Sequence, residues 1–241
     1  YDKRGFAPSV FYNLEDRLYV GFGYGFTNYT WRRKPFATKQ FVDLHYSISQ
    51  NAISASYGGL FPRLICGWDL ALSAYYDAER WTNFFGLGNE TVVTTRNKEY
   101  NRTRSEQWFG SVGVQKQFSK STVFITGIYQ HVQILHDSER YVVKEFAPLY
   151  SKTFETNDYV GPDVTYTYVR VNDSIVPTQG VTLMANAAYV WDTHEGESFQ
   201  KYTGKLRFYV PLSNKFSLAI KGGVSTVAGN DEVINSAQYY E

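Results

Sequence analysis

The chain has 241 residues and a formal net charge of +1 at pH 7, so it carries no strongly basic field of the kind that binds nucleic acid. Its 21 Tyr, 17 Phe and 19 Gly, against one Met, favour strands over helices. The single cysteine, Cys66, excludes an internal disulfide and a zinc site built from paired cysteines.

No apolar run reaches the roughly 18 residues of a membrane-spanning helix. The longest run, 181–191, is interrupted by Thr182 and Asn186. This excludes a helical membrane protein but leaves a membrane β-barrel open, because barrel strands alternate apolar and polar residues. The chain starts at Tyr1 without Met or a signal peptide, so we expect a processed chain or a fragment.

Alternation at period two predicts eleven antiparallel β-strands. In the clearest case, the apolar positions of 202–210 alternate with Lys201, Thr203, Lys205 and Arg207. No helix of normal length competes, so we predict an all-β fold. In chain order, the expected strands cover residues 6–13, 16–32, 38–49, 52–61, 67–78, 100–118, 121–134, 160–172, 179–191, 198–211 and 214–226.

The connections between these strands alternate in length. Tight turns at 118–121 and 211–214 alternate with long polar loops at roughly 79–99 and 135–159. Short turns on one rim and long loops on the other are typical of outer-membrane barrels. The sequence therefore predicts an antiparallel transmembrane β-barrel with about eleven strands present.

A soluble β-sandwich or lipocalin-like barrel would show the same alternation. Strand length favours the membrane, because several predicted strands exceed the usual five or six residues and reach the roughly 9 to 11 of a tilted span. Aromatic residues near strand ends also fit an interfacial girdle. The expected membrane-interface aromatics are Trp31, Trp68, Tyr76, Trp81, Phe84, Phe85, Trp108 and Trp191.

A basic stripe is predicted on neighbouring strands near the end of the chain. It consists of Lys201, Lys205, Arg207 and Lys221. In a membrane barrel these side chains must face the lumen, since Lys or Arg at the lipid midplane costs about 2 to 4 kcal/mol. The stripe either tunes a pore for anions or receives an acidic plug, or it simply solvates the lumen.

No catalytic, cofactor or metal site is predicted. Gly86 and Gly88 resemble a shortened dinucleotide fingerprint, but no third glycine and no helix follow. The four histidines include no closely spaced pair on one face. Nothing pairs a nucleophile with a nearby base, so we expect a protein that is not an enzyme.

Several segments together resemble a known family. They are 16–25 (DRLYVGFGYG), 32–39 (RRKPFATK), 67–70 (GWDL), 83–91 (NFFGLGNET) followed by 100–104 (YNRTR), and 237–241 (AQYYE). On these segments, most of the chain resembles the barrel of the outer-membrane assembly-factor superfamily of BamA/TamA type, the bacterial surface antigen family, and especially its Bacteroidetes branch.

The resemblance implies a barrel of about sixteen strands in the outer membrane of a Gram-negative bacterium. Residues 1–241 would then form the N-terminal portion of this single barrel domain, ending just before the signature of the sixth extracellular loop. Periplasmic POTRA domains are absent from the sequence. Because eleven strands is an odd number, the remaining strands are expected from the same or another chain.

The resemblance further implies a protein that inserts or translocates other proteins by pairing a nascent strand with its exposed first strand. The expected partners are outer-membrane lipid, nascent outer-membrane proteins and accessory lipoproteins. Pro8 fits an exposed seam strand because it cannot donate to a ladder, although it could instead merely begin its strand. Alternatives are a passive pore or ligand-binding barrel, and a membrane anchor for an upstream metallophosphoesterase domain.

Overall fold

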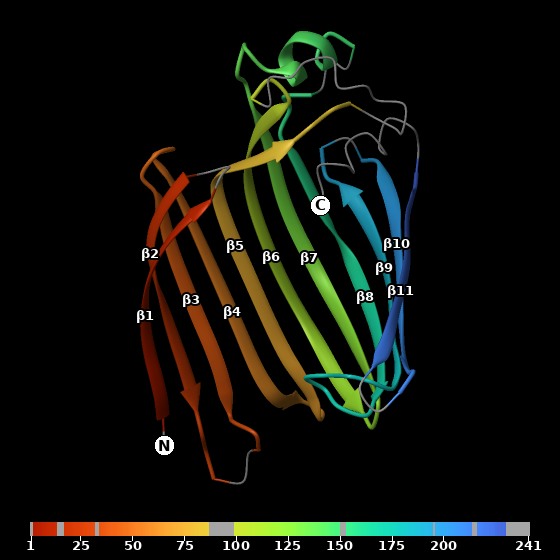
Figure 1. Cartoon of the computed structure of the whole chain (residues 1–241). Coiled ribbons are helices and arrows are strands. Elements are labelled where there is room, and N and C mark those ends of the chain that lie inside the picture. The colour runs from red at the N-terminus through yellow and green to blue at the C-terminus, as the bar shows by residue number, and fades with distance from the viewer. Residues whose placement is uncertain are drawn as a thin grey trace.

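The computed structural model describes residues 2–13, 17–31, 34–86, 99–149, 153–194, 196–213 and 216–229. These residues form one eleven-stranded antiparallel sheet in which the strands pair in chain order. Figure 1 shows the sheet as a curved wall, with the edge strands β1 and β11 well apart. In the part of the chain that the structure describes, no helix is both long and apolar enough to cross a membrane.

All eleven predicted strands are present, which confirms the all-β antiparallel fold class. Their bounds are β1 Asp2–Asn13, β2 Arg17–Asn28, β3 Thr38–Ser47, β4 Ala52–Ile65, β5 Trp68–Asn83, β6 Arg102–Phe118, β7 Ser121–Leu135, β8 Asn157–Val171, β9 Gly180–Asp192, β10 Ser198–Pro211 and β11 Ser217–Ala228.

Three strands extend at least four residues beyond a predicted end, and one stops short. β1 begins at Asp2 rather than residue 6, β4 continues to Ile65 rather than 61, and β5 continues to Asn83 rather than 78, whereas β2 ends at Asn28 rather than 32. In β5 the pairing with β6 shifts between Asp77 and Arg80, which is a β-bulge. The extra residue changes which face each later side chain occupies, so period two is broken and the sequence pattern stops early.

The two faces of the sheet differ in burial because the sheet curves. On β6 and β7, buried side chains such as Gln107 and Gln130 alternate with exposed ones such as Trp108 and Ile125. Curvature crowds side chains on the inside, so the face with Gln107 and Gln130 is the concave face. The face with Trp108 and Ile125 is the convex face.

The convex face carries an apolar belt whose side chains are mostly exposed to the surroundings. The register places the following residues on this face: Val20, Phe22, Val42, Leu44, Leu70, Leu72, Val112, Val114, Ile125, Val164, Leu183, Leu206 and Phe208. An apolar convex face with a polar concave face is the arrangement of a membrane barrel.

The two rims of the sheet carry different connections. The rim with the connections at 119–120 and 172–179, here the turn side, lies at the bottom of Figure 1. The opposite rim, here the loop side, carries the connection 136–156 and its short π-helix Val142–Phe146. Near the loop side, a buried cluster of Tyr159, Ala188, Val190 and Phe199 lies on the concave face.

Candidate functional site: the sheet edges and the concave face

β1 and β11 are the two edges of the described sheet. β1 pairs with β2, β11 pairs with β10, and no pairing joins the two edges among the described strands. An edge strand exposes backbone N–H and C=O groups that can pair with another strand. Both edges are therefore candidate sites for strand addition.

In an antiparallel sheet, successive residues of a strand bond alternately to the neighbours on its two sides. This alternation determines whether the backbone nitrogen of Pro8 faces β2 or the open edge. Ile48 N donates to Leu18 O over 3.1 Å, so Leu18 and every second residue after it in β2 bond to β3. Phe22 belongs to this set and lies opposite Pro8. The backbone nitrogen of Pro8 therefore faces the open edge. Pro8 is also the seventh residue of β1, so the alternative that it merely begins the strand is wrong.

The same alternation shows which residues of β11 direct their backbone groups at the open edge. Leu212 N donates to Phe216 O over 2.9 Å, and these residues continue the register in which Pro211 lies opposite Ser217. Even-numbered residues of β11 therefore bond to β10, while odd-numbered residues, Lys221 among them, direct their N–H and C=O groups at the open edge. A cationic side chain thus stands at this edge.

The basic stripe predicted from sequence is assembled on the concave face of β10 and β11. Arg207 lies directly opposite Lys221, and Lys201 and Lys205 occupy the same face of β10. Like charges directly opposite each other destabilise a sheet. No described carboxylate forms an ion pair with Lys205, Arg207 or Lys221.

Small residues line the concave face of β1 and β2 at the opposite edge. A Cβ on Gly21 would lie 2.4 Å from Leu44 O and from His45 Cδ2, and one on Gly23 would lie 2.4 Å from Asp43 Oδ1. The two glycines therefore let polar side chains of β3 lie flat against the wall. The concave face of β2 therefore carries no side-chain bulk at these two positions.

Of the eight predicted interface aromatics, seven are exposed or half-buried, and Trp81 is buried. The exposed fractions of Trp31 and Trp108 are 87% and 48%. Trp108 packs on Tyr76 with ring centroids 4.1 Å apart, and the Trp68 ring lies 5.5 Å from Lys116 Nζ. Phe85 and Trp191 are also exposed.

Trp81 and Phe84 do not occupy the expected position at the membrane surface. Trp81 is 8% exposed, and its ring is surrounded by Arg102, Arg104 and Arg140 at 4.5, 5.3 and 5.0 Å. Phe84 packs edge-on against Phe146 at 4.9 Å and on Tyr141 at 6.1 Å. The strand extension after the β-bulge carries both residues beyond the apolar belt and under the 136–156 connection. Residues 87–91 of the glycine-containing segment lie outside the described residues.

A carboxylate site that the sequence did not reveal lies at the loop side. Asp158 accepts hydrogen bonds from Tyr129 Oη at 2.8 Å and from His131 Nδ1 and His194 Nε2, both at 2.7 Å. Its backbone oxygen accepts from Thr193 N at 2.8 Å. The hydrogen bond to Asp158 raises the pKa of His194 above 6.5. The histidines are far apart in sequence, so only the strand register brings them together.

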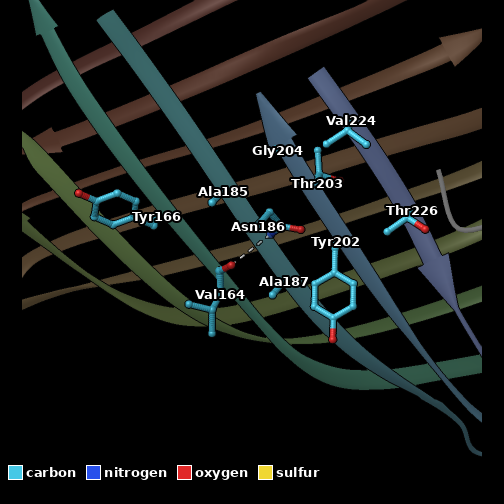
Figure 2. Close-up of a pocket in the computed structure, with 10 residues that line it drawn as sticks. All are labelled: Val164, Tyr166, Ala185, Asn186, Ala187, Tyr202, Thr203, Gly204, Val224 and Thr226. Atoms are coloured by element: carbon cyan, nitrogen blue, oxygen red, sulfur yellow. Dashed lines mark hydrogen bonds between the residues drawn. The ribbon is translucent and has the colours of Figure 1, made fainter. Parts of the chain in front are cut away.

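A shallow apolar hollow of about 460 Å³ lies on the convex face over β8 to β11 (Figure 2). Ala185, Ala187 and Gly204 form its floor, and Tyr166 and Tyr202 stand beside it. Asn186, from the same stretch of β9, instead donates to Asp163 Oδ2 at 2.7 Å. The residues lining the hollow include no acid and no base.

Within the described ranges, no group of three or more His, Cys, Asp or Glu residues is arranged to hold a metal ion. Neither family models nor curated proteins give a sequence match to this chain. Among solved structures, BamA from Haemophilus ducreyi lacking POTRA domains 1–3 is similar, with a TM-score of 0.67 and 12% sequence identity. The alignment covers 96% of this chain and 42% of that one.

The chain has a BamA-type barrel fold. At 12% identity the similarity establishes the fold, and the chain spans less than half of the BamA chain it matches. The convex apolar face, the polar concave face and the two open edges are the features from which a function can be argued.

Proposed function

We propose that this barrel is an outer-membrane insertase or translocase whose β1 edge pairs with a strand of a nascent outer-membrane protein. The open β1 edge is the observation that carries this proposal. Arg4, Phe6, Val10 and Tyr12 direct their backbone N–H and C=O groups at that edge, whereas Pro8 presents only its C=O group. An incoming strand would satisfy these groups, which are costly to leave unpaired in lipid.

The position of Pro8 suits temporary pairing. A strand added to β1 would lack one ladder bond at Pro8, so its release would be easier than from an uninterrupted edge. The convex side chains of β1, Phe6 and Val10, are 66% and 72% exposed and match the apolar outer face of a barrel strand. These features support an edge that accepts a strand and then releases it.

The proposal includes a location and partners. An apolar belt of this kind suits the outer membrane of a Gram-negative bacterium, and the BamA-type fold supports that location. Additional strands from the same or another chain would complete the barrel wall, and accessory lipoproteins are further candidate partners. The Bacteroidetes branch rests on the sequence resemblance.

Site-directed cross-linking in reconstituted vesicles tests the strand pairing. The background is Cys66→Ser, because the native Cys66 is exposed. Val10→Cys on β1 is expected to form a disulfide with a cysteine in the last strand of a small outer-membrane protein arrested during insertion. Leu72→Cys, on the convex face of the interior strand β5, is the matched control and is expected to give no adduct.

Two results would contradict the insertase proposal. One is equal cross-linking at Val10→Cys and Leu72→Cys, which would indicate contact without pairing at the edge. The other is substrate insertion that proceeds at the same rate with and without this protein in the vesicles.

The basic stripe favours a second candidate function, an anion-selective pore. The charges of Arg207 and Lys221 face each other on the concave wall, where they would attract anions into a lumen. A planar-bilayer recording distinguishes the two functions. A large, steady conductance that loses anion selectivity in Arg207→Gln/Lys221→Gln would support the pore and count against the insertase.

A further inference from the structure

Charged residues on the convex face are confined to the two margins of the apolar belt. Between these margins, the convex positions of the described strands contain no Asp, Glu, Lys or Arg. Arg4, Lys116 and Arg170 lie toward the turn side, near the ends of β1, β6 and β8. Glu106 and Asp158 lie toward the loop side. The register also places Asp2 beside Arg4 at the turn side and Arg104 on the same face as Glu106 at the loop side. At the turn-side margin, cations therefore outnumber acids.

Aromatic rings hold two of the turn-side cations. Lys116 Nζ lies 5.5 Å from the Trp68 ring centroid and 5.8 Å from that of Phe118. Arg4 Cζ lies 5.6 Å from the centroid of Phe26. Long basic side chains flanked by aromatic rings are typical of residues that bury their apolar stems while the charge stays in the interfacial layer.

These cations have little charge compensation from the protein. No described carboxylate pairs with Lys116 or Arg170, and Arg4 contacts Asp2 only at 3.8 Å, with both side chains exposed. The loop-side acids are better satisfied: Glu106 accepts from Trp108 Nε1 at 3.1 Å. The turn side therefore has unneutralised positive charge at the edge of the apolar belt.

We propose that Arg4, Lys116 and Arg170 form an interaction surface for anionic phospholipids, with the cations binding headgroup phosphates. The belt would place acyl chains beside the convex face, and the cations at its turn-side margin would then lie level with the headgroups. Charge complementarity selects anionic over zwitterionic lipid, because the latter carries a compensating cation. This surface requires the membrane barrel but not the insertase activity.

Native mass spectrometry of detergent-solubilised protein with equimolar phosphatidylglycerol and phosphatidylcholine tests the proposal. The wild-type protein is expected to retain phosphatidylglycerol preferentially. Arg4→Gln/Lys116→Gln/Arg170→Gln is expected to lower that preference at least about fivefold, given the attraction of individual cations to an anionic surface. The matched control, Lys205→Gln/Arg207→Gln/Lys221→Gln, removes three charges from the concave face and is expected to keep the preference.

Further measurements separate lipid recognition from misfolding and from binding of free phosphate. Each variant is checked for the heat-sensitive electrophoretic mobility of a folded barrel, and Arg4→Lys/Lys116→Arg/Arg170→Lys is expected to retain the preference. The proposal is overturned if the wild-type protein shows no preference, if both Gln triples lose it equally, or if the charge-conserving triple loses it. Displacement of phosphatidylglycerol by millimolar inorganic phosphate would also overturn a lipid headgroup as the ligand.

Discussion

Gly21 and Gly25 occupy the same concave row of β2 but have different surroundings. A Cβ on Gly21 would lie 2.4 Å from the backbone oxygen of Leu44, whereas a Cβ on Gly25 would meet nothing within 4 Å. We expect Gly21→Ala to destabilise the folded barrel by about 1 to 3 kcal/mol, because backbone must move. Gly25→Ala is expected to change the free energy of unfolding by less than about 0.5 kcal/mol. Urea unfolding in lipid vesicles measures both, and equal losses would contradict the steric explanation.

Asp158 and the side chains that donate to it, Tyr129, His131 and His194, form the Asp158 cluster. Within it, the contact between Asp158 and His194 is expected to depend on pH. Since the hydrogen bond to Asp158 raises the pKa of His194 above 6.5, the charged contact stabilises the fold below pH 6.5 and is lost as pH rises through the raised pKa. An NMR titration is expected to show this raised pKa, and Asp158→Asn should return it to about 6.5. A titration unchanged by Asp158→Asn would contradict the contact.

At the scale of elements, alternation predicted every strand because one face of each is apolar and the other polar. The predicted faces and exposure of side chains were wrong where tertiary structure overrides the pattern. The β-bulge between Asp77 and Arg80 reverses the faces of β5, and the cap formed by 136–149 buries Trp81 from a distant part of the chain. The basic stripe was predictable as a group because its residues share period two. The contacts of Asp158 depend instead on the register of two strand pairings, β7 with β8 and β8 with β9.

The cap itself yields a prediction about proteolysis. The ring of Trp81 contacts three guanidinium groups, one of them Arg140 in the 136–156 connection, and each such contact is worth about 0.5 to 2 kcal/mol. We expect Trp81→Ala to raise tryptic cleavage after the exposed Lys144 at least about tenfold, because the cap opens more often. Trp108→Ala, which removes an exposed tryptophan of the convex face, is the control. Equal cleavage of the two variants would show that Trp81 does not hold the cap.

At the scale of the whole molecule, the position of charged residues marks off an apolar layer on the convex face. From Glu106 to Lys116 the convex side of β6 is free of charge over ten residue steps, about 25 Å along the barrel axis for a strand tilted by about 40°. This matches the roughly 25 Å apolar band of outer-membrane barrels. Sequence alternation alone could not establish which face contacts lipid, because a soluble barrel alternates identically; the burial of Gln107 and Gln130 on the concave face supplies the missing observation.

A pair of adjacent arginine substitutions tests this assignment of the faces. Val112 is 55% exposed at the centre of the convex belt, and Val112→Arg is expected to destabilise the barrel in lipid vesicles by about 2 to 4 kcal/mol. Ser111 lies one residue away on the concave face, where its hydroxyl is 2.7 Å from that of Ser73. Ser111→Arg is expected to cost less than about 1 kcal/mol, because a polar lumen solvates the charge and only one weak hydrogen bond is lost. Equilibrium unfolding in vesicles compares the two variants. If Ser111→Arg were the more damaging substitution, the convex face could not be the lipid-facing one, and the anionic lipid surface at its margin would be excluded with it.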